Sequence, residues 1–389
     1  MKDGGARKSS NQAICVTRNK DSGHKPVREE SYSSRLFFKS NDFSYVDAIV
    51  DPERENRTGP KGYAPSSIFM ALLFMYLKGM GSILELVRFL CSNPEWLQVL
   101  GLRRSVHGRM LYRVPDRSTF YKFAGRLGVE GMTEVFARTV VQLVRMGVIT
   151  GEKVSLDCSI IWAWFKDCRF AKRPGHGKQC RRHRTRDREA SWTWDDHGES
   201  YIYGYKVHIA IDTSSGLPIM LTVTRAGFGE NRTVAWFLRM FLKLKLHVKE
   251  FLADAAYDAN RTRLLVIKKL RAIPLIALNP RNCEGDTEEE KRARCKELRQ
   301  KFYAKNFLKS WWIDPDSELF DKEFDARTFS EQAFSVGKGS LNLDSLKHRG
   351  VAWATLHAVC ICTVMLGVAK TAIDIGRPDL ARCIRCFQA

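Results

Sequence analysis

The pattern of apolar residues changes near Gly147, and this change constrains the fold more than any other feature of the sequence. Between about residues 47 and 146, apolar side chains recur at helical spacing, with a run of Phe, Met and Leu within 68–77. After Gly147, short apolar runs bounded by turn residues alternate with helical stretches. The sequence therefore predicts a helical first part and a second part of the α/β class.

The second part contains several segments typical of β-strands, because they are short, apolar and bounded by turn residues. We predict strands at 153–161, 205–211, 217–224, 251–254 and 273–278. The second and third flank the turn 212–216 and form a hairpin. We predict helices at 231–244, 260–269, 284–299 and 324–336, and an apolar helix from Val351. This order predicts a mixed sheet with helices on its faces.

These patterns divide the chain into four sections. Residues 1–35 are polar and basic and form a flexible arm, which either contacts DNA phosphates or has no partner. Residues 36–148 form a small all-α domain, either a helix-turn-helix DNA reader or a packing domain without base contacts. Residues 149–370 form the α/β domain, with a basic insertion at 165–200 and a charged insertion at 281–322. Residues 371–389 are a C-terminal tail.

The charge of the chain indicates its class of partner. The 389 residues include 64 Lys and Arg against 43 Asp and Glu, which gives a net charge of +21. Such a surplus attracts polyanions, of which nucleic acid is the commonest. The surplus does not by itself indicate an enzyme, since passive packaging proteins are also basic. A hydrophobic content of 44% excludes wholesale disorder.

The sequence also predicts where the protein works. No apolar stretch follows Met1, so we expect no secretory signal. Eleven cysteines, an odd number scattered along the chain, fit reduced intracellular thiols. The uncharged run 351–369 is almost long enough to span a bilayer, but it contains His357, Thr355, Thr363 and Gly367. We expect a buried helix, no membrane partner and a cytoplasmic protein.

Two aspartates stand where the predicted strands are otherwise apolar. Asp157 lies within the strand 153–161, and Asp254 ends the strand 251–254. A carboxylate in such a place costs free energy unless it is paired, and a divalent cation is an efficient partner. Either aspartate alone would more often be a cap or a structural hydrogen-bonding group. Two of them, on strands expected to be neighbours, favour a shared site.

A third acid, Glu331, lies on a helical stripe with Phe324, Arg327, Phe334 and Lys338. Steps of three and four residues place the five side chains on one face of a helix. If this face were solvated, Arg327 and Glu331 would be an ordinary ion pair. The two aromatic rings indicate instead that the face packs against the protein and holds its charged groups beside the core.

The order and spacing of Phe324, Arg327, Glu331 and Lys338 resemble a known signature. It is the Tyr-Arg-Glu-Lys signature of bacterial and archaeal insertion-sequence transposases of the DDE type (insertion sequence four/five superfamily). Phe324 stands at the tyrosine position, which keeps the ring and loses the hydroxyl. This signature is the most specific part of the resemblance.

The resemblance extends to other parts of the chain. The strand with Asp157 resembles the first acidic motif of the family, and Asp254 followed by Tyr257 resembles the second. The segment 203–208 resembles the opening of the family's hairpin, and the helical segments 63–86 and 115–127 resemble its N-terminal domain. The three acids are weak motifs separately, but their order and spacing match the family.

This resemblance implies a ribonuclease H-like catalytic domain in which Asp157, Asp254 and Glu331 converge on two Mg²⁺ ions, with Mn²⁺ as a substitute. Such enzymes cut DNA at the terminal inverted repeats of a mobile element and join the freed ends to target DNA. At least two protomers would hold the two ends, near the nucleoid of a prokaryote. The residues assigned to DNA binding are Arg327, Lys338, Lys206, Arg181, Arg182 and Arg184.

Two alternatives use the same residues: a non-catalytic DNA-binding protein derived from a transposase, and a nuclease of the same fold that never joins strands. The basic insertion also contains four residues whose spacing matches no common zinc finger, namely Cys168, His176, Cys180 and His183. A basic DNA-contact loop is therefore favoured over a zinc site. Cys383 and Cys386 have no second Cys pair nearby, which indicates structural or incidental thiols.

Overall fold

The computed structural model describes residues 33–389 apart from 55, 57, 60, 165–186 and 196–198. The predicted residues Arg181, Arg182 and Arg184 and the Cys/His cluster lie outside the described residues.

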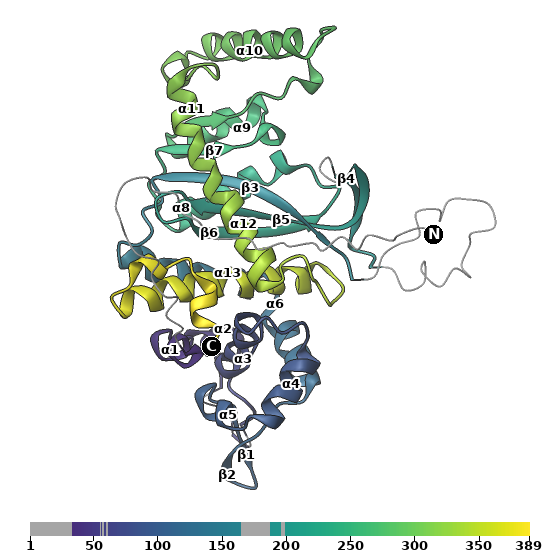
Figure 1. Ribbon diagram of the computed structural model, residues 1–389, viewed down its shortest axis with the longest axis vertical. Coiled ribbons are helices and arrows are strands. Elements are labelled where there is room, and N and C mark those ends of the chain that lie inside the picture. Colours follow the sequence, from purple (N-terminus) through teal and green to yellow (C-terminus); the bar gives the residue numbers. More distant parts are fainter. Residues whose placement is uncertain (1–32, 55, 57, 60, 165–186, 196–198) are drawn as a thin grey trace, which may run out of the picture. The chain divides into compact units, whose positions relative to one another are not determined.

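Helices dominate the part of the chain before residue 147 (Figure 1). They are α1 (Ser34–Ser40), α2 (Tyr45–Val50), α3 (Pro65–Leu77), α4 (Ile83–Ser92), α5 (Glu95–Val99) and α6 (Arg117–Arg145). α3 begins at Pro65 because proline fits the first turn of a helix. The Asp47 carboxylate accepts hydrogen bonds from the Ser66 amide (2.7 Å) and hydroxyl (3.0 Å). This carboxylate therefore gives a partner to a backbone N–H in the first turn of the helix, which has none within the helix.

The same part also contains a β-hairpin, so the prediction of an all-α domain is wrong. Strands β1 (Arg103–Val106) and β2 (Arg109–Tyr112) pair antiparallel around the turn His107–Gly108. The φ angles of His107 and Gly108 are 47° and 75°, as a type I′ turn requires. Neither strand shows a clean alternation of apolar and polar residues, and for this reason the pattern did not indicate it.

A mixed sheet follows, as predicted. Its strands are β3 (Lys153–Trp162), β4 (Ser191–Asp195), β5 (Ser200–Asp212), β6 (Leu217–Arg225), β7 (Glu250–Ala253) and β8 (Ile273–Ile276). β3 is central: it pairs antiparallel with β5 and parallel with β7. β5 also pairs antiparallel with β4 and β6, and β7 pairs parallel with β8. β4 lies within the predicted basic insertion, where no strand was expected.

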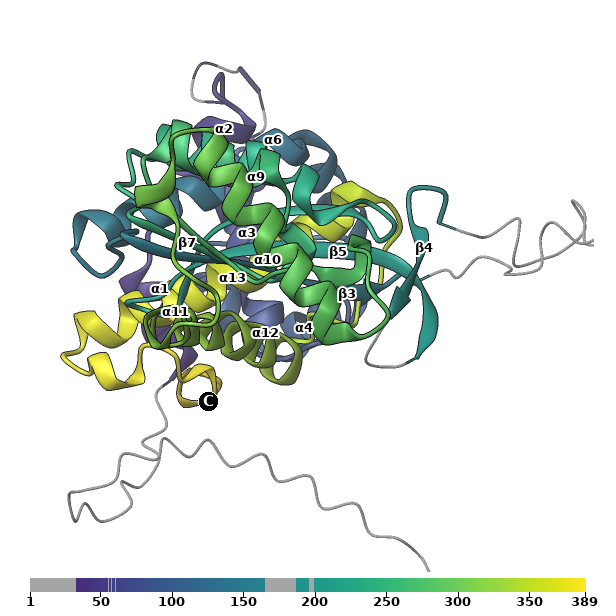
Figure 2. The same ribbon diagram turned by 90° about the horizontal axis from the view of Figure 1, so that it is seen from above.

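Helices pack around this sheet. They are α8 (Val234–Lys243), α9 (Asn260–Leu265), α10 (Glu288–Lys305), α11 (Glu318–Phe324), α12 (Thr328–Leu341) and α13 (Val351–Asp374). α12 packs on β3 and β5, and α11 packs on β8. Viewed from above, α12 and α9 lie on opposite sides of the strands (Figure 2).

The apolar helix α13 lies between the sheet and the N-terminal helices (Figure 1). It contacts β6 on one side and α3 and α6 on the other. By length and composition α13 is able to cross a membrane, but 83% of its apolar window is buried inside the protein. Buried residues of α3, α6, the sheet and α13 form one continuous hydrophobic cluster. The division at residue 148 stays a prediction, since the helical part shares this core.

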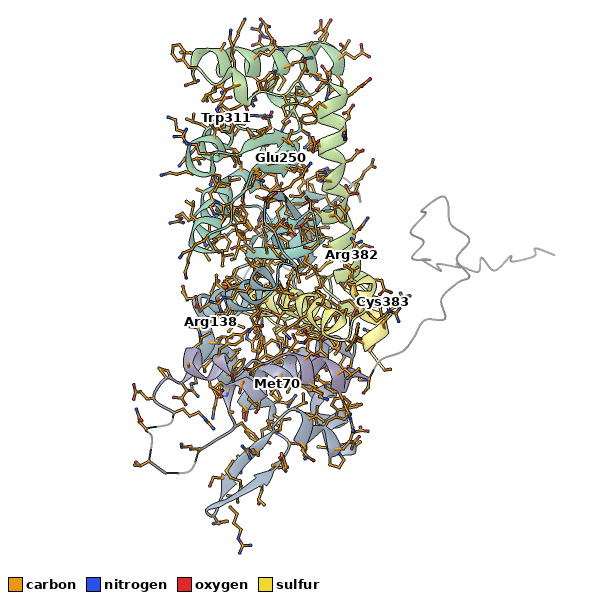
Figure 3. The ribbon with its side chains drawn as sticks, turned by 90° about the vertical axis from the view of Figure 1, so that its left-hand side faces the viewer. Met70, Arg138, Glu250, Trp311, Arg382 and Cys383 are labelled. Carbon is orange, nitrogen blue, oxygen red and sulfur yellow. A yellow bond between two sulfur atoms is a disulfide. The ribbon has the colours of Figure 1, made fainter. Side chains whose placement is uncertain are left out.

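The C-terminal segment after α13 is packed rather than loose. Ile384 and Phe387 are buried, and the Ser34 hydroxyl donates a hydrogen bond to the Ala389 carbonyl at 2.8 Å. Cys383 and Cys386 form a disulfide, so the prediction of thiols at these two positions is wrong. Cys383 lies on this segment in Figure 3. The predicted C-terminal tail is therefore part of the folded structure.

Candidate active site

The register of two adjacent parallel strands brings Asp157 and Asp254 side by side. β3 and β7 pair from Lys153 with Glu250 to Leu156 with Ala253. The next step of the same register aligns Asp157 with Asp254, at the point where β7 ends. Asp254 then caps the following turn, accepting a hydrogen bond from the Ala256 amide at 3.0 Å.

The segment from α11 to α12 packs on the face of β3 that carries Asp157. Alternate residues of a strand point to one face of its sheet. Three alternate residues of β3 contact this segment: Lys153 with Glu323, Ser155 with Ser330, and Asp157 with Arg327. The Ser155–Ser330 hydrogen bond is buried and 2.7 Å long, so the start of α12, and with it Glu331, is held beside Asp157.

Arg327 joins two of the predicted acids. Its Nη1 lies 3.3 Å from Asp157 Oδ2, and its Nη2 lies 2.6 Å from Glu331 Oε1. The Asp157 side chain is 12% exposed, whereas the Glu331 side chain is 58% exposed. Within the described part of the chain, no three Asp, Glu, His or Cys side chains gather closely enough to hold a metal ion. Arg327 contacts both carboxylates, so Asp157 and Glu331 lie on either side of its guanidinium.

The two aspartates carry the electrostatic signature of a functional site. Burial, and then the neighbouring charge of Asp254, raise the pKa of Asp157 to about 6. Burial, and then the charge of Glu230, raise the pKa of Asp254. Two carboxylates held together in a buried place repel each other, and a cation relieves that repulsion. Carboxylate oxygens are also the ligands that Mg²⁺ prefers. The side chains of Asp157 and Asp254 are therefore chemically suited to bind a divalent metal ion.

Glu230 is a fourth acid at this site, and the sequence analysis missed it. It lies in the turn between β6 and α8, and this turn contacts the turn after Asp254. Its Oε1 accepts a hydrogen bond from Lys206 Nζ at 2.7 Å, and both side chains are 13% exposed. One sequence signal could have revealed Glu230: it is an acidic residue in the Gly-rich turn that follows the predicted hairpin. Only the fold places that turn beside β7.

The remaining predicted residues have separate positions. Lys338 is exposed on α12, two turns after Glu331. Lys206 is on β5 and is paired with Glu230. Tyr257, from the second acidic motif, is fully buried, and its hydroxyl lies 3.3 Å from Nδ1 of His208. Burial lowers the pKa of His208 to about 3, so this neutral ring supports the site structurally.

Comparisons with known protein families identify the family of the chain. Residues 167–366, just over half of the chain, match the family model described as the Transposase DDE domain. This match contains Asp254 and Glu331 and starts after Asp157. Residues 25–126 match a second model, described as a Transposase domain. No curated protein and no solved structure matches the chain. The chain belongs to the DDE transposases of insertion sequences, enzymes that cut DNA and join the cut strands to a target.

Proposed function

We propose that Asp157, Asp254 and Glu331 are the catalytic residues of this transposase and bind two Mg²⁺ ions, for which Mn²⁺ substitutes. DDE transposases in general use divalent metal ions. One observation carries the assignment: the buried Asp157 on β3 is aligned with the half-buried Asp254 at the end of β7, and Arg327 links Asp157 to Glu331. When bound there, such ions supply the activated nucleophile and stabilise charge on the leaving oxygen of a phosphodiester.

The strand order supports a ribonuclease H-like domain. The central strand β3 has the antiparallel pair β5 and β6 on one side and the parallel strands β7 and β8 on the other. This arrangement places the first acid on the central strand and the second at the end of its parallel neighbour. The third acid then comes from α12, which packs across β3 and β5.

We assign the DNA contacts to the basic residues around these acids. Arg327 and Lys338 flank Glu331 and would bind phosphates at the end of the mobile element. A phosphate held by Arg327 would lie beside Asp157, because the guanidinium already lies 3.3 Å from that carboxylate. Arg181, Arg182 and Arg184 would bind DNA from the basic insertion. The ion pair of Lys206 with Glu230 supports a positioning role for this lysine rather than a DNA contact.

The substrates in this proposal are the terminal inverted repeats and a target DNA. The net charge of +21 supports binding to two long polyanions. Two protomers or more would hold the two ends together, in the prokaryotic cytoplasm near the nucleoid.

Cleavage of a supercoiled plasmid that carries the element with both ends tests this proposal. We expect Asp157→Asn, Asp254→Asn and Glu331→Gln each to lower cleavage by at least about a thousand-fold, because each removes a ligand of the ions that lower the barrier. Asp325→Asn is the matched control, since Asp325 is an exposed carboxylate just before Arg327. Calorimetric titration with Mn²⁺ adds a second measurement, and the aspartate variants should bind the ion more weakly.

Some results would contradict the assignment. Full cleavage by Asp157→Asn, or unchanged Mn²⁺ affinity in both aspartate variants, would show that these carboxylates are not the metal site. Joined plasmid products distinguish the transposase from a nuclease of the same fold, which would yield only cut ends. DNA binding without any cutting would indicate the non-catalytic alternative.

A further inference from the structure

The ribbon β1–β2 has a strongly basic surface. Residues 103–113 contain four arginines and one histidine and no acidic residue. Arg103, Arg109 and Arg113 are exposed, and none of the three makes an ion pair with another residue that the structure describes. The ribbon extends away from helices α3–α5 (Figures 1 and 3). Three arginine charges are therefore available to an outside partner.

Exposed apolar side chains lie among these arginines. Met110, Leu111 and Tyr112 are 51%, 48% and 51% exposed. Residues that pair across an antiparallel ladder share a face, so Arg103 and Tyr112 lie on the same face, together with Met110. An apolar patch between positive charges is uncommon on a surface without a binding partner.

The base of the ribbon is fixed to the rest of the protein. The Ser105 amide donates a hydrogen bond to the Lys61 carbonyl at 3.2 Å, and the Arg113 amide donates one to the Leu102 carbonyl at 3.0 Å. The Arg104 guanidinium lies 5.9 Å from the ring centre of Tyr63. Arg104 is thus used within the protein, whereas Arg103, Met110 and Tyr112 on one face and the exposed Arg109 on the other are left for a partner.

We propose that the ribbon β1–β2 is a DNA-binding element that enters a groove of duplex DNA. A two-stranded ribbon fits the major groove, and several DNA-binding proteins read a groove in this way. Arg103, Arg109 and Arg113 contact phosphates, and Met110 and Tyr112 pack against the groove. The proposal rests on the transposase function and adds a DNA contact that lies outside the carboxylate site.

Charge favours DNA over a protein partner. A protein interface has few charged residues at its centre, whereas this ribbon has Arg103 beside Tyr112 on one face and Arg109 at the turn on the other. A second copy of the chain would bring the same arginines against one another, and like charges repel.

Fluorescence anisotropy with a labelled duplex tests the proposal, using the full chain and EDTA so that no cleavage occurs. The test variant is Arg103→Gln/Arg109→Gln. We expect affinity at about 0.1 M salt to fall by about ten-fold, and the slope of log Kd against log salt to fall by about 2, because each lost phosphate contact removes about 0.9. The matched control is Arg145→Gln/Arg239→Gln, which removes two exposed arginines elsewhere and should leave the slope unchanged.

A second variant tests the apolar side chains. We expect Met110→Ser/Tyr112→Ser to weaken DNA binding with the salt slope unchanged, because this variant removes no charge. Thermal melting of each variant verifies folding. The proposal is wrong if both arginine pairs lower the slope equally, or if neither does. It is also wrong if Met110→Ser/Tyr112→Ser leaves DNA affinity intact but changes the sedimentation of the protein, since the ribbon would then be an interface between copies.

These outcomes are independent of the catalytic assignment. Binding in EDTA requires no metal, so Asp157→Asn should bind the duplex as the wild-type protein does. If the carboxylates were misassigned, Asp157→Asn would still cut the plasmid while the ribbon result would stand. If the ribbon were misassigned, its variants would bind normally while the carboxylate variants would remain inactive.

Discussion

Asp157 is held in a place that favours function over stability. It is buried beside Asp254, and the pKa of its carboxyl is raised to about 6 by burial and by that neighbour. In the unfolded chain the same group has a pKa near 3.8. Between pH 3.8 and 6 the folded protein binds more protons than the unfolded chain does. The free energy of unfolding therefore falls as pH rises through this range, and the loss is complete above about pH 6. Arg327 offsets part of this cost through its ion pair.

We therefore expect Asp157→Asn to raise the free energy of unfolding at pH 7.5 by about 1–3 kcal/mol, because the amide removes the buried charge. Urea unfolding at pH 7.5 and at pH 4 measures the effect. The gain should shrink towards pH 4, where the carboxyl of the folded wild-type protein is already neutral. A variant that is less stable than wild type at pH 7.5 would show that the Arg327 pair outweighs the cost of burial.

Single backbone positions shape the elements of the N-terminal part. The two left-handed residues of the ribbon turn allow β1 and β2 to pair closely. α6 is kinked at Gly128, which has φ 60° and ψ 176°. Only glycine adopts these angles without strain. Gly125 lies one turn earlier in the same helix and has a negative φ.

This contrast gives a matched pair of variants. We expect Gly128→Ala to destabilise the protein by about 1–3 kcal/mol, because an added Cβ is strained at these angles. Gly125→Ala should be neutral or stabilising by up to about 1 kcal/mol, since an alanine side chain there meets no atom within 4 Å. Thermal or urea unfolding of both variants measures the difference. Equal changes in the free energy of unfolding for the two substitutions would contradict the claim that an added Cβ is strained at Gly128.

At the scale of the whole molecule, α13 connects the N-terminal helices to the sheet, and His357 lies at this connection. Its Nδ1 accepts a hydrogen bond from the Tyr76 hydroxyl at 2.8 Å, and its Nε2 donates one to the Leu343 carbonyl at 2.9 Å. Both ring nitrogens are satisfied in the neutral form. Burial lowers the pKa of His357 to about 4. The neutral ring therefore holds α3 and the segment before α13 together.

We expect the protein to lose stability as pH falls from about 6.5 towards 4, because the unfolded chain takes up a proton at His357 that the folded protein excludes. The contribution of His357 is up to about 3 kcal/mol. Urea unfolding across this range should show a flatter pH dependence for His357→Gln than for wild type. His208 and His348, whose pKa values burial also lowers, retain part of the dependence.

His107→Gln is the control, because His107 is exposed. This variant should show the same pH dependence of the free energy of unfolding as the wild-type protein. An unchanged profile in His357→Gln would contradict the role of this histidine.

Much of the fold was predictable because its signals are local. The strands β3, β5, β6, β7 and β8 and the helices α3, α8 and α13 were predicted close to their observed positions. Each is a run of apolar residues with one period, bounded by turn residues. The hairpin β1–β2 and the strand β4 were missed because arginine and aromatic residues interrupt the apolar pattern of both.

By itself the sequence determined the order of the elements, the basic character of the protein and the three acids that resemble the transposase signature. Periodicity, charge and motif spacing are properties of the chain alone. The tertiary structure alone decided that Asp157 aligns with Asp254, that Arg327 contacts both Asp157 and Glu331, and that Glu230 lies beside them. These facts depend on strand register and helix packing between distant segments, and pairing across a sheet leaves no mark in the local sequence.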